Sequence, residues 1–257
     1  MNTVKIAYSC EMPLFNIKMN QSPMPSMSYP ILYSLRNCPY AMRARLVIFK
    51  TKQTVILRDV DLKNKPAAML TASPKGTVPI LVLSSITEQS NIIEEDNIEE
   101  SIIEESLEVM LWAVHKNDPS DLLLKKMSGA EDEMLKIIHT FDQEFKSRLE
   151  QYKCAKRYRE DNIEACRTAC EVYIQLLEQR LNQHAFLFSA QESLLDLALL
   201  PFIRQFARVE RQWYLQSAYP KLRQWLNNYL QSALFSKVMA NVEVWQENDE
   251  VIYFGDK

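Results

Sequence analysis

One cysteine stands where its thiol could act as a nucleophile. Cys38 follows a short apolar segment, Ile31 to Tyr33, and precedes Pro39, which suits the first position of a helix because its missing N–H costs nothing there. The unpaired N–H groups and the dipole of a helix start favour an anion, so we expect a lowered pKa for the Cys38 thiol. Low-pKa thiols leave mixed disulfides quickly, and this pattern therefore favours thiol transfer.

The same segment sets a limit on that chemistry. Position 41 is Ala, so no second cysteine completes a C-x-x-C motif, and an external thiol would have to release Cys38 from a disulfide. The alternative interpretation is that Cys38 is an inert, small apolar residue. Arg43 and Arg45 follow on the same segment, where they either lower the pKa of Cys38 or face solvent.

The elements that would position Cys38 follow from apolar periodicity. Three strands and two helices alternate over the first part of the chain, which is typical of a small α/β unit. From Ser106 onwards the apolar residues keep helical spacing, and Ser193 to Asp196 has the form of a capping box, so we expect only helices there. The expected strands are 31–33, 54–60 and 78–83, and the expected helices between them begin at Pro39 and Pro66.

Composition excludes several classes of protein. The chain of 257 residues carries 30 Lys plus Arg against 33 Asp plus Glu, without a basic stripe, so we expect no nucleic-acid partner. Its 3 isolated glycines rule out the glycine-rich phosphate loops. No apolar run is long enough to cross a membrane. The 5 cysteines form neither a disulfide framework nor a zinc motif, which predicts a reduced, cytoplasmic protein without a metal site.

Two segments do not fit the periodic pattern. Residues 1–28 are rich in Pro and Met, and we expect a disordered extension there. The acidic insert, residues 84–100, interrupts the α/β unit and is expected to be a solvated loop. These boundaries predict an α/β domain over 29–112 and an all-helical domain over 118–257.

Four motifs then resemble one known family. Cys38 to Leu46, Ser73 to Leu81 and Glu105 to Met110 are similar, in this order, to the active-site segment, the cis-proline turn and the Glu-Ser motif of the glutathione transferases. Residues 193–207 resemble the capped helix of their C-terminal domain. The resemblance is to the cysteine-type, omega-like, bacterial-type branch. It implies a thioredoxin-like N-terminal domain followed by a C-terminal helical bundle, and a homodimer.

The resemblance also implies a glutathione site. Cys38 would be the catalytic residue, Val78 would pair with the cysteinyl backbone beside a cis peptide bond, and Lys65 would meet the glycyl carboxylate. Glu95–Asp96 is a competing register for the γ-glutamyl site, and we prefer Glu105–Ser106 because an amphipathic helix continues from it. The implied glutathione-binding residues are Pro39, Tyr40, Lys65, Val78, Pro79, Glu105 and Ser106.

The function that we expect is that of a glutathione-dependent thiol transferase or reductase. Its partners would be glutathione and a small electrophilic or disulfide acceptor, bound in an apolar pocket between the domains. One alternative is a conjugating transferase in which the hydroxyl of Tyr33 or Ser34 activates glutathione. The other is a non-catalytic scaffold of the same fold, with the acidic segment 88–108 as its contact surface for a protein partner.

Overall fold

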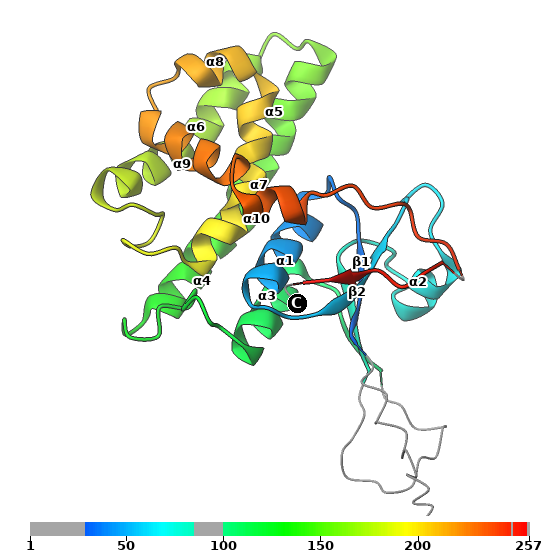
Figure 1. The fold of residues 1–257 in the computed structure, drawn as a ribbon. Coiled ribbons are helices and arrows are strands. Elements are labelled where there is room, and N and C mark those ends of the chain that lie inside the picture. Colours follow the sequence, from blue (N-terminus) through cyan, green and yellow to red (C-terminus); the bar gives the residue numbers. More distant parts are fainter. Residues whose placement is uncertain (1–28, 85–99, 248, 256–257) are drawn as a thin grey trace, which may run out of the picture.

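The structure is a computed structural model that describes residues 29–84, 100–247 and 249–255. A small sheet with its helices lies beside a larger group of helices (Figure 1). The predicted extension, residues 1–28, and most of the acidic insert lie outside the described residues. The first unit contains β1 (Ile31–Ser34), α1 (Pro39–Lys50), β2 (Val55–Asp59), α2 (Ala67–Ala72), β3 (Ile80–Ser84), β4 (Glu100–Ile103) and α3 (Ser106–Lys116).

The C-terminal half is helical, as its apolar spacing predicts. The predicted apolar repeat over residues 134–152 forms one continuous helical run whose middle turn is a π-helix, η1. None of the helices in the described part of the chain is both long and apolar enough to cross a bilayer. The elements are α4 (Ala130–Thr140), η1 (Phe141–Phe145), α5 (Lys146–Tyr158), α6 (Ile163–Gln183), α7 (Leu194–Val209), α8 (Arg211–Gln216), α9 (Pro220–Leu230) and α10 (Ala233–Val238), followed by a final strand, β5 (Tyr253–Phe254).

The sheet is mixed, with the strand order β4-β3-β1-β2-β5. β1 and β2 are parallel, with Ile31 opposite Ile56, because α1 carries the chain back between them. β3 runs antiparallel to β1, with Ile31 opposite Val82, and β4 and β5 pair antiparallel at the two edges. The mixed sheet with its helices forms the thioredoxin-like domain that the resemblance implies. The helical half forms the second domain.

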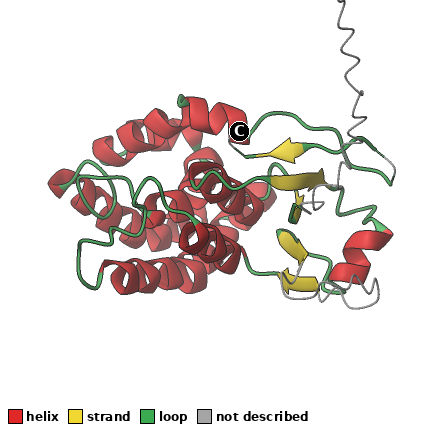
Figure 2. Cartoon of the chain, turned by 60° about the horizontal axis from the view of Figure 1, so that its bottom comes forward, coloured by secondary structure: helices red, strands yellow, loops and turns green. Residues whose placement is uncertain are grey.

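The two faces of the sheet enter different cores. Successive strand side chains point to opposite faces, so Leu32 and Tyr33 are buried on different sides. Leu32 and Leu81 pack with α1 and α3 toward the helical domain, whereas Tyr33 and Ile80 pack with Met69 of α2. Figure 2 shows this layering, with the helical domain beyond one face of the sheet and a single helix beyond the other.

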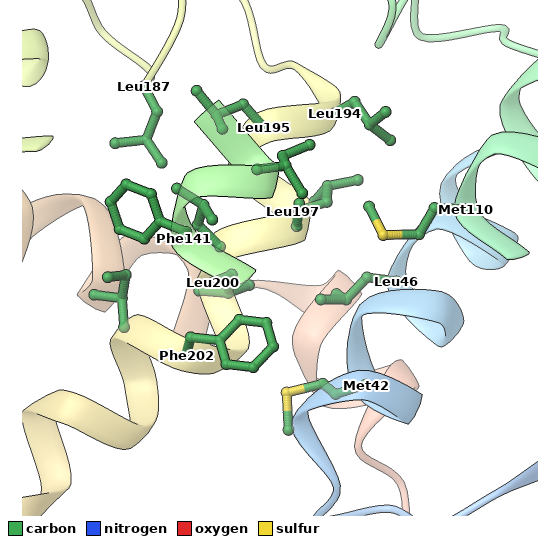
Figure 3. Close-up of a cluster of buried hydrophobic side chains, with 14 of the residues drawn as sticks. Met42, Leu46, Met110, Phe141, Leu187, Leu194, Leu195, Leu197, Leu200 and Phe202 are labelled. Carbon is green, nitrogen blue, oxygen red and sulfur yellow. The ribbon is translucent and has the colours of Figure 1, made fainter. Parts of the chain in front are cut away.

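One hydrophobic core joins the two domains. Met42 and Leu46 of α1 and Met110 of α3 face Leu197 and Phe202 of α7, and all five side chains are buried (Figure 3). Each such side chain contributes about 1.5–3 kcal/mol relative to an exposed one. The position of α1 against the helical domain is therefore set by packing on both of its sides.

The expectation of helix alone beyond Ser106 is wrong at the C-terminal end. The chain leaves α10, crosses back to the sheet and adds β5 to the edge of β2, where the N–H of Leu57 donates to the carbonyl of Ile252 over 2.8 Å. Gly255 allows this return, because a Cβ there would lie 2.0 Å from the Gln53 carbonyl oxygen. Two residues of β pairing are too short to produce a periodic signal in the sequence.

The predicted capping box at the start of α7 is confirmed, and its carboxylate does more than cap. Asp196 is fully buried and accepts from the N–H and the hydroxyl of Ser193, at 3.0 and 2.7 Å. It also accepts from the N–H of Leu187 and from Trp225 Nε1, each at 2.9 Å. One side chain therefore ties the start of α7 to the preceding loop and to α9.

We expect Asp196→Ala to lower the free energy of unfolding by about 3 kcal/mol or more, because several buried donors lose their acceptor at once. Urea unfolding followed by circular dichroism would measure the change. Asp196→Asn is the matched control, and it should cost less because one acceptor oxygen remains. Equal stabilities for the Ala and Asn variants would contradict the role given to this carboxylate.

Candidate active site

Cys38 occupies the junction between β1 and α1. It is the N-cap residue of α1, Pro39 is at the first helical position, and the N–H of Cys38 donates to the carbonyl of Leu35 over 3.0 Å. The helix start that the sequence predicts is thus confirmed. The side chain is half-buried, and its thiol donates to the carbonyl oxygen of Val78 over 3.8 Å. Cys38 is thus partly exposed as a residue, and its sulfur lies against the cis-proline turn.

The expected lowering of the Cys38 pKa is wrong. Burial raises the pKa of this thiol, and it outweighs the backbone hydrogen bonds from Ala41 and Tyr40 and the charge of Arg43, which lower it. The helix start does favour the thiolate, as the sequence suggests, but the surrounding apolar side chains remove more hydration than the N–H groups replace. Cys38 is therefore mainly a neutral thiol at pH 7.

The predicted proline turn is present. The peptide bond between Val78 and Pro79 is cis. Among the described residues, the N–H of Val78 makes no hydrogen bond, and its carbonyl accepts only the thiol of Cys38. Two residues earlier, Gly76 has φ +59, and a Cβ there would lie 2.9 Å from Lys65 Nζ. An unpaired backbone N–H, a thiol and an ammonium group therefore gather around this turn.

Arg43 connects this turn region to the helical domain. It is only 3% exposed, and its Nε donates to the Ser106 hydroxyl oxygen over 2.9 Å. Its two terminal nitrogens donate to the carboxylate of Asp142 at 3.0 and 2.8 Å, a bidentate pair. Its guanidinium also lies over the rings of Tyr40 and Phe202, at 5.7 and 5.4 Å. Asp142 is on the π-helical turn η1.

The start of α3 lies beside the proline turn. α3 begins at Ser106, as predicted, with Glu105 as its N-cap residue. Glu105 forms an ion pair with Lys75, and the hydroxyl of Ser73 donates to Glu104. The competing register, Glu95–Asp96, lies outside the described residues. The turn that carries Val78 is thus bound to the residues that precede α3.

The structure brings the predicted residues into one region and removes several other candidates. Neither Arg43 nor Arg45 faces solvent. The hydroxyl of Tyr33 accepts from Arg58 over 2.6 Å, and Ser34 is fully buried. Cys170 lies in the core, where burial raises its pKa to about 12.

Sequence reasoning missed the contribution of the helical domain to this region. Asp142 and Phe202 reach Arg43 and Tyr40 from across the domain interface. Asp142 belongs to none of the recognised motifs, and the motif that contains Phe202 gave no sign of this contact. Trp213 of α8 packs against Phe206 and Arg167. Within residues 29–84, 100–247 and 249–255, no group of His, Cys, Asp and Glu side chains could hold a metal ion.

This arrangement can carry nucleophilic chemistry on a peptide-like ligand. The thiol of Cys38 can act as a nucleophile, and the N–H of Val78, which has no partner among the described residues, can pair with an extended backbone as an added strand. Lys65 places a positive charge beside Gly76, and Glu105 carries a negative charge that is paired with Lys75. A small zwitterionic peptide matches this set of groups.

Comparisons with known proteins agree with this arrangement. Residues 32–120 match the family model of the glutathione S-transferase N-terminal domain, and residues 160–228 match that of the C-terminal domain. A probable glutathione transferase from Aplysia californica is 35% identical over 66 residues, which cover 26% of this chain and 72% of that protein. Glutathione S-transferase omega-2 from Rattus norvegicus is 42% identical over 50 residues, only 20% of each chain.

Solved structures show the same fold. A glutathione transferase family member from Pseudomonas fluorescens, crystallised with two glutathione molecules, has a TM-score of 0.68 at 15% identity, and the match covers 84% of this chain and 95% of that one. Glutathione transferase Omega 2C from Trametes versicolor has a TM-score of 0.64 at 18% identity, with 82% and 93% covered.

The raised pKa of Cys38 predicts how the reactivity of its thiol depends on pH. A thiol reacts as its thiolate, so alkylation of Cys38 by iodoacetamide should keep accelerating with pH above about 8.5, the pKa of an unstructured cysteine. Mass spectrometry of the Cys38 peptide, on a Cys154→Ser background that removes an exposed thiol, would measure the rate. A midpoint below about 7 would contradict the dominance of burial.

Arg43 and Asp142 should behave as a coupled pair. Arg43→Met should lower the free energy of unfolding by about 3 kcal/mol, because it leaves the Asp142 carboxylate without its cation. The double variant Arg43→Met/Asp142→Asn should lose less than the sum of the single variants, by about 1 kcal/mol or more. Strictly additive losses in denaturant unfolding would show that the contact between the domains is not energetically coupled.

Proposed function

The chain belongs to the glutathione transferase family, and we propose that it is a thiol transferase that works through a mixed disulfide between Cys38 and glutathione. One observation carries the proposal: an accessible sulfur at the start of α1 lies 3.8 Å from the carbonyl of Val78, whose N–H is free to pair with a peptide. A tripeptide docked on Val78 would present its own sulfur to Cys38.

Glutathione would be held by groups around this turn. Val78 would pair with the cysteinyl backbone, next to Pro79, and Lys65 would meet the glycyl carboxylate. Ser106 lies at the first position of α3, a helix of 11 residues, whose N–H groups suit the γ-glutamyl carboxylate. Glu105 is 61% exposed and can exchange Lys75 for the ligand's ammonium group.

Arg43 would keep the serine oriented. Its Nε donates to the Ser106 hydroxyl oxygen, which fixes this side chain at the start of α3, where Ser106 is only 3% exposed. Pro39 and Tyr40 would form the wall of the site on the side of the helical domain, where the Tyr40 ring lies 5.3 Å from that of Phe202. The binding site would therefore draw on both domains.

The reaction is an exchange of disulfides. The thiolate of Cys38 attacks the glutathione sulfur of a mixed disulfide, a bond forms between the two sulfurs, and the acceptor leaves as a thiolate that takes up a proton. A second glutathione, as thiolate, then attacks the same glutathione sulfur, which releases glutathione disulfide and restores Cys38. The N–H groups of Tyr40 and Ala41 and the charge of Arg43 support the thiolate in both steps.

The residue at position 41 implies that an external thiol must release Cys38 from the mixed disulfide. Ala41 takes the place of a resolving cysteine and is fully buried in the first turn of α1. Because the pKa of Cys38 is raised, we expect attack to be limited by the thiolate fraction, so that turnover increases with pH.

Two other functions have less support. A conjugating transferase needs a hydroxyl beside the bound thiol, but Tyr33 is 2% exposed and engaged by Arg58, and Ser34 is fully buried. A non-catalytic scaffold has no need for an accessible thiol beside a free backbone N–H. The homodimer and the cytoplasmic location that the sequence suggests stay predictions.

Cys38→Ala should abolish reduction of the mixed disulfide of glutathione and 2-mercaptoethanol, because within the described residues no other cysteine contacts Val78. Glutathione binding should largely survive, since the peptide contacts lie on Val78, Ser106 and Lys65. A coupled spectrophotometric assay and a calorimetric titration would measure the two quantities. Cys154→Ala is the matched control, because it removes an exposed cysteine outside the proposed site and should leave both unchanged.

The same assays separate the rival functions. Full reductase activity in the Cys38→Ala variant would refute the thiol transferase. Turnover of an aryl halide that exceeds disulfide turnover in the unmodified protein would favour the conjugating enzyme instead. Failure of the unmodified protein to bind glutathione in the titration would favour the scaffold.

A further inference from the structure

A basic cleft opens between the two domains, beside the residue that precedes Cys38. It has a volume of about 410 Å³ and lies between the β1–α1 loop and the helices α5 and α7, which pack against each other (Figure 1). Asn37, the residue directly before Cys38, is part of its lining. The five cations of the lining are Lys153, Lys156, Arg157, Arg204 and Arg208, and we call this set the basic cleft.

Only part of this charge is neutralised by the protein. Lys153 pairs with Glu150 at 2.5 Å, and Lys156 approaches Glu210 at 3.6 Å. Glu210 is itself engaged by Arg167 at 2.7 Å, so it is shared between cations. The lining contains no carboxylate at all.

The three arginines have no such partner. Within the described part of the chain, neither Arg157, Arg204 nor Arg208 forms an ion pair, and Glu160 and Asp161, which follow α5, do not reach them. Like charges one helical turn apart, as at positions 204 and 208, oppose each other.

The arginines therefore repel one another and leave charge unbalanced. The guanidinium of Arg204 is half-buried and lies over the Phe235 ring at 5.7 Å. An anion between Arg204 and Arg208 would relieve this repulsion, and Arg157 would add a third positive charge.

The position of the cleft relates its positive charge to the reaction proposed at Cys38. Val78 contacts Cys38 from the α/β domain, whereas Asn37 connects Cys38 to the cleft formed by the helical domain. A disulfide whose glutathione half is docked on Val78 would direct its other half toward the helical domain. The second half would then meet a lining in which five residues are cationic and one, Val209, is apolar, whereas the sequence led us to expect an apolar pocket.

We propose that the basic cleft binds the acceptor, and that the acceptor is a small thiol compound whose non-glutathione half carries a carboxylate or another anionic group. This rests on the proposed function, because the acceptor is the second half of the disulfide that Cys38 attacks. The cleft selects the anionic disulfide, and the acceptor leaves as an anionic thiolate that the same arginines stabilise until it is protonated.

The first test requires no glutathione. Methanethiosulfonates of similar size that carry a sulfonate, a hydroxyl or a trimethylammonium group each convert a thiolate to a disulfide with loss of methanesulfinate. Their rates on Cys38 are measured by mass spectrometry of its peptide, and N-acetylcysteine is the reference thiol. We expect the ratio of anionic to cationic rates on Cys38 to exceed the reference ratio by about tenfold, and to fall as salt is added.

The variants remove exposed charges, so folding is not at risk. Arg157→Gln/Arg208→Gln should lower the anionic-to-cationic ratio by about fivefold, as expected for two exposed cations, and should leave the rate of the neutral reagent unchanged. Lys136→Gln, which removes an exposed cation from α4 at the other end of the helical run, is the matched control and should leave the ratio unchanged. A wild-type ratio equal to the reference, or a ratio that the double variant does not move, overturns the proposal.

A second test measures how the same charges affect the turnover of mixed disulfides. Mixed disulfides of glutathione with 2-mercaptoethanesulfonate, 2-mercaptoethanol and cysteamine share one half and differ in the other. We expect kcat/KM to decrease in that order, and the preference for the sulfonate to shrink by about fivefold in Arg157→Gln/Arg208→Gln. Equal kcat/KM values would overturn the acceptor assignment.

Together the two tests distinguish an error in the thiol-transferase assignment from an error in the anionic acceptor. If none of the three disulfides is turned over while the reagents still show the charge preference, the thiol transferase is wrong and the cleft is an anion site beside Cys38. If the neutral disulfide is turned over well without any charge preference in either test, the thiol transferase stands and the anionic acceptor is wrong.

Discussion

The arrangement of this protein depends on one buried guanidinium. Arg43 enters from α1, holds the hydroxyl of Ser106 at the start of α3 and forms a bidentate pair with Asp142 on η1. A buried cation must be paired, so these elements cannot separate without exposing or orphaning a charge. Apolar side chains of α1 and α7 pack at this interface, and the hydrogen bonds of Arg43 fix how α1, α3 and η1 are placed relative to one another. The nucleophile begins the same helix and is positioned by the same constraint.

The same packing determines how Cys38 behaves. A helix start alone would favour its thiolate, but Cys38 is partly buried against the cluster that contains Ala41, Met69 and Val78, and burial raises the pKa of the thiol. The packing that fixes the position of Cys38 therefore also disfavours the ionisation of its thiol. A thiol in this state suits a reaction in which a docked disulfide is presented to it, because proximity can replace intrinsic reactivity.

Charge is divided between the two domains around this thiol. The α/β domain provides a backbone N–H, Lys65 and the Glu105–Lys75 pair, a mixed set that suits a zwitterionic peptide. The helical domain provides unpaired arginines and no carboxylate in the lining of its cleft. In the proposed reaction, the glutathione half of the disulfide would be bound by the α/β domain and the acceptor half by the helical domain.

The sequence by itself determined the helix start at Pro39 and the capping box at Ser193, because each depends on residues that are close along the chain. The cis-proline turn and the thioredoxin-like fold were expected only through the resemblance of four ordered motifs to a family. Only the tertiary structure decided which residues meet across the interface. Arg43 and Asp142 are far apart in sequence, β5 is too short to leave a period, and the arginines of the cleft look like ordinary surface charges. The pKa of Cys38 had the opposite sign to the local prediction for the same reason: hydration is removed by neighbours that the chain brings together only on folding.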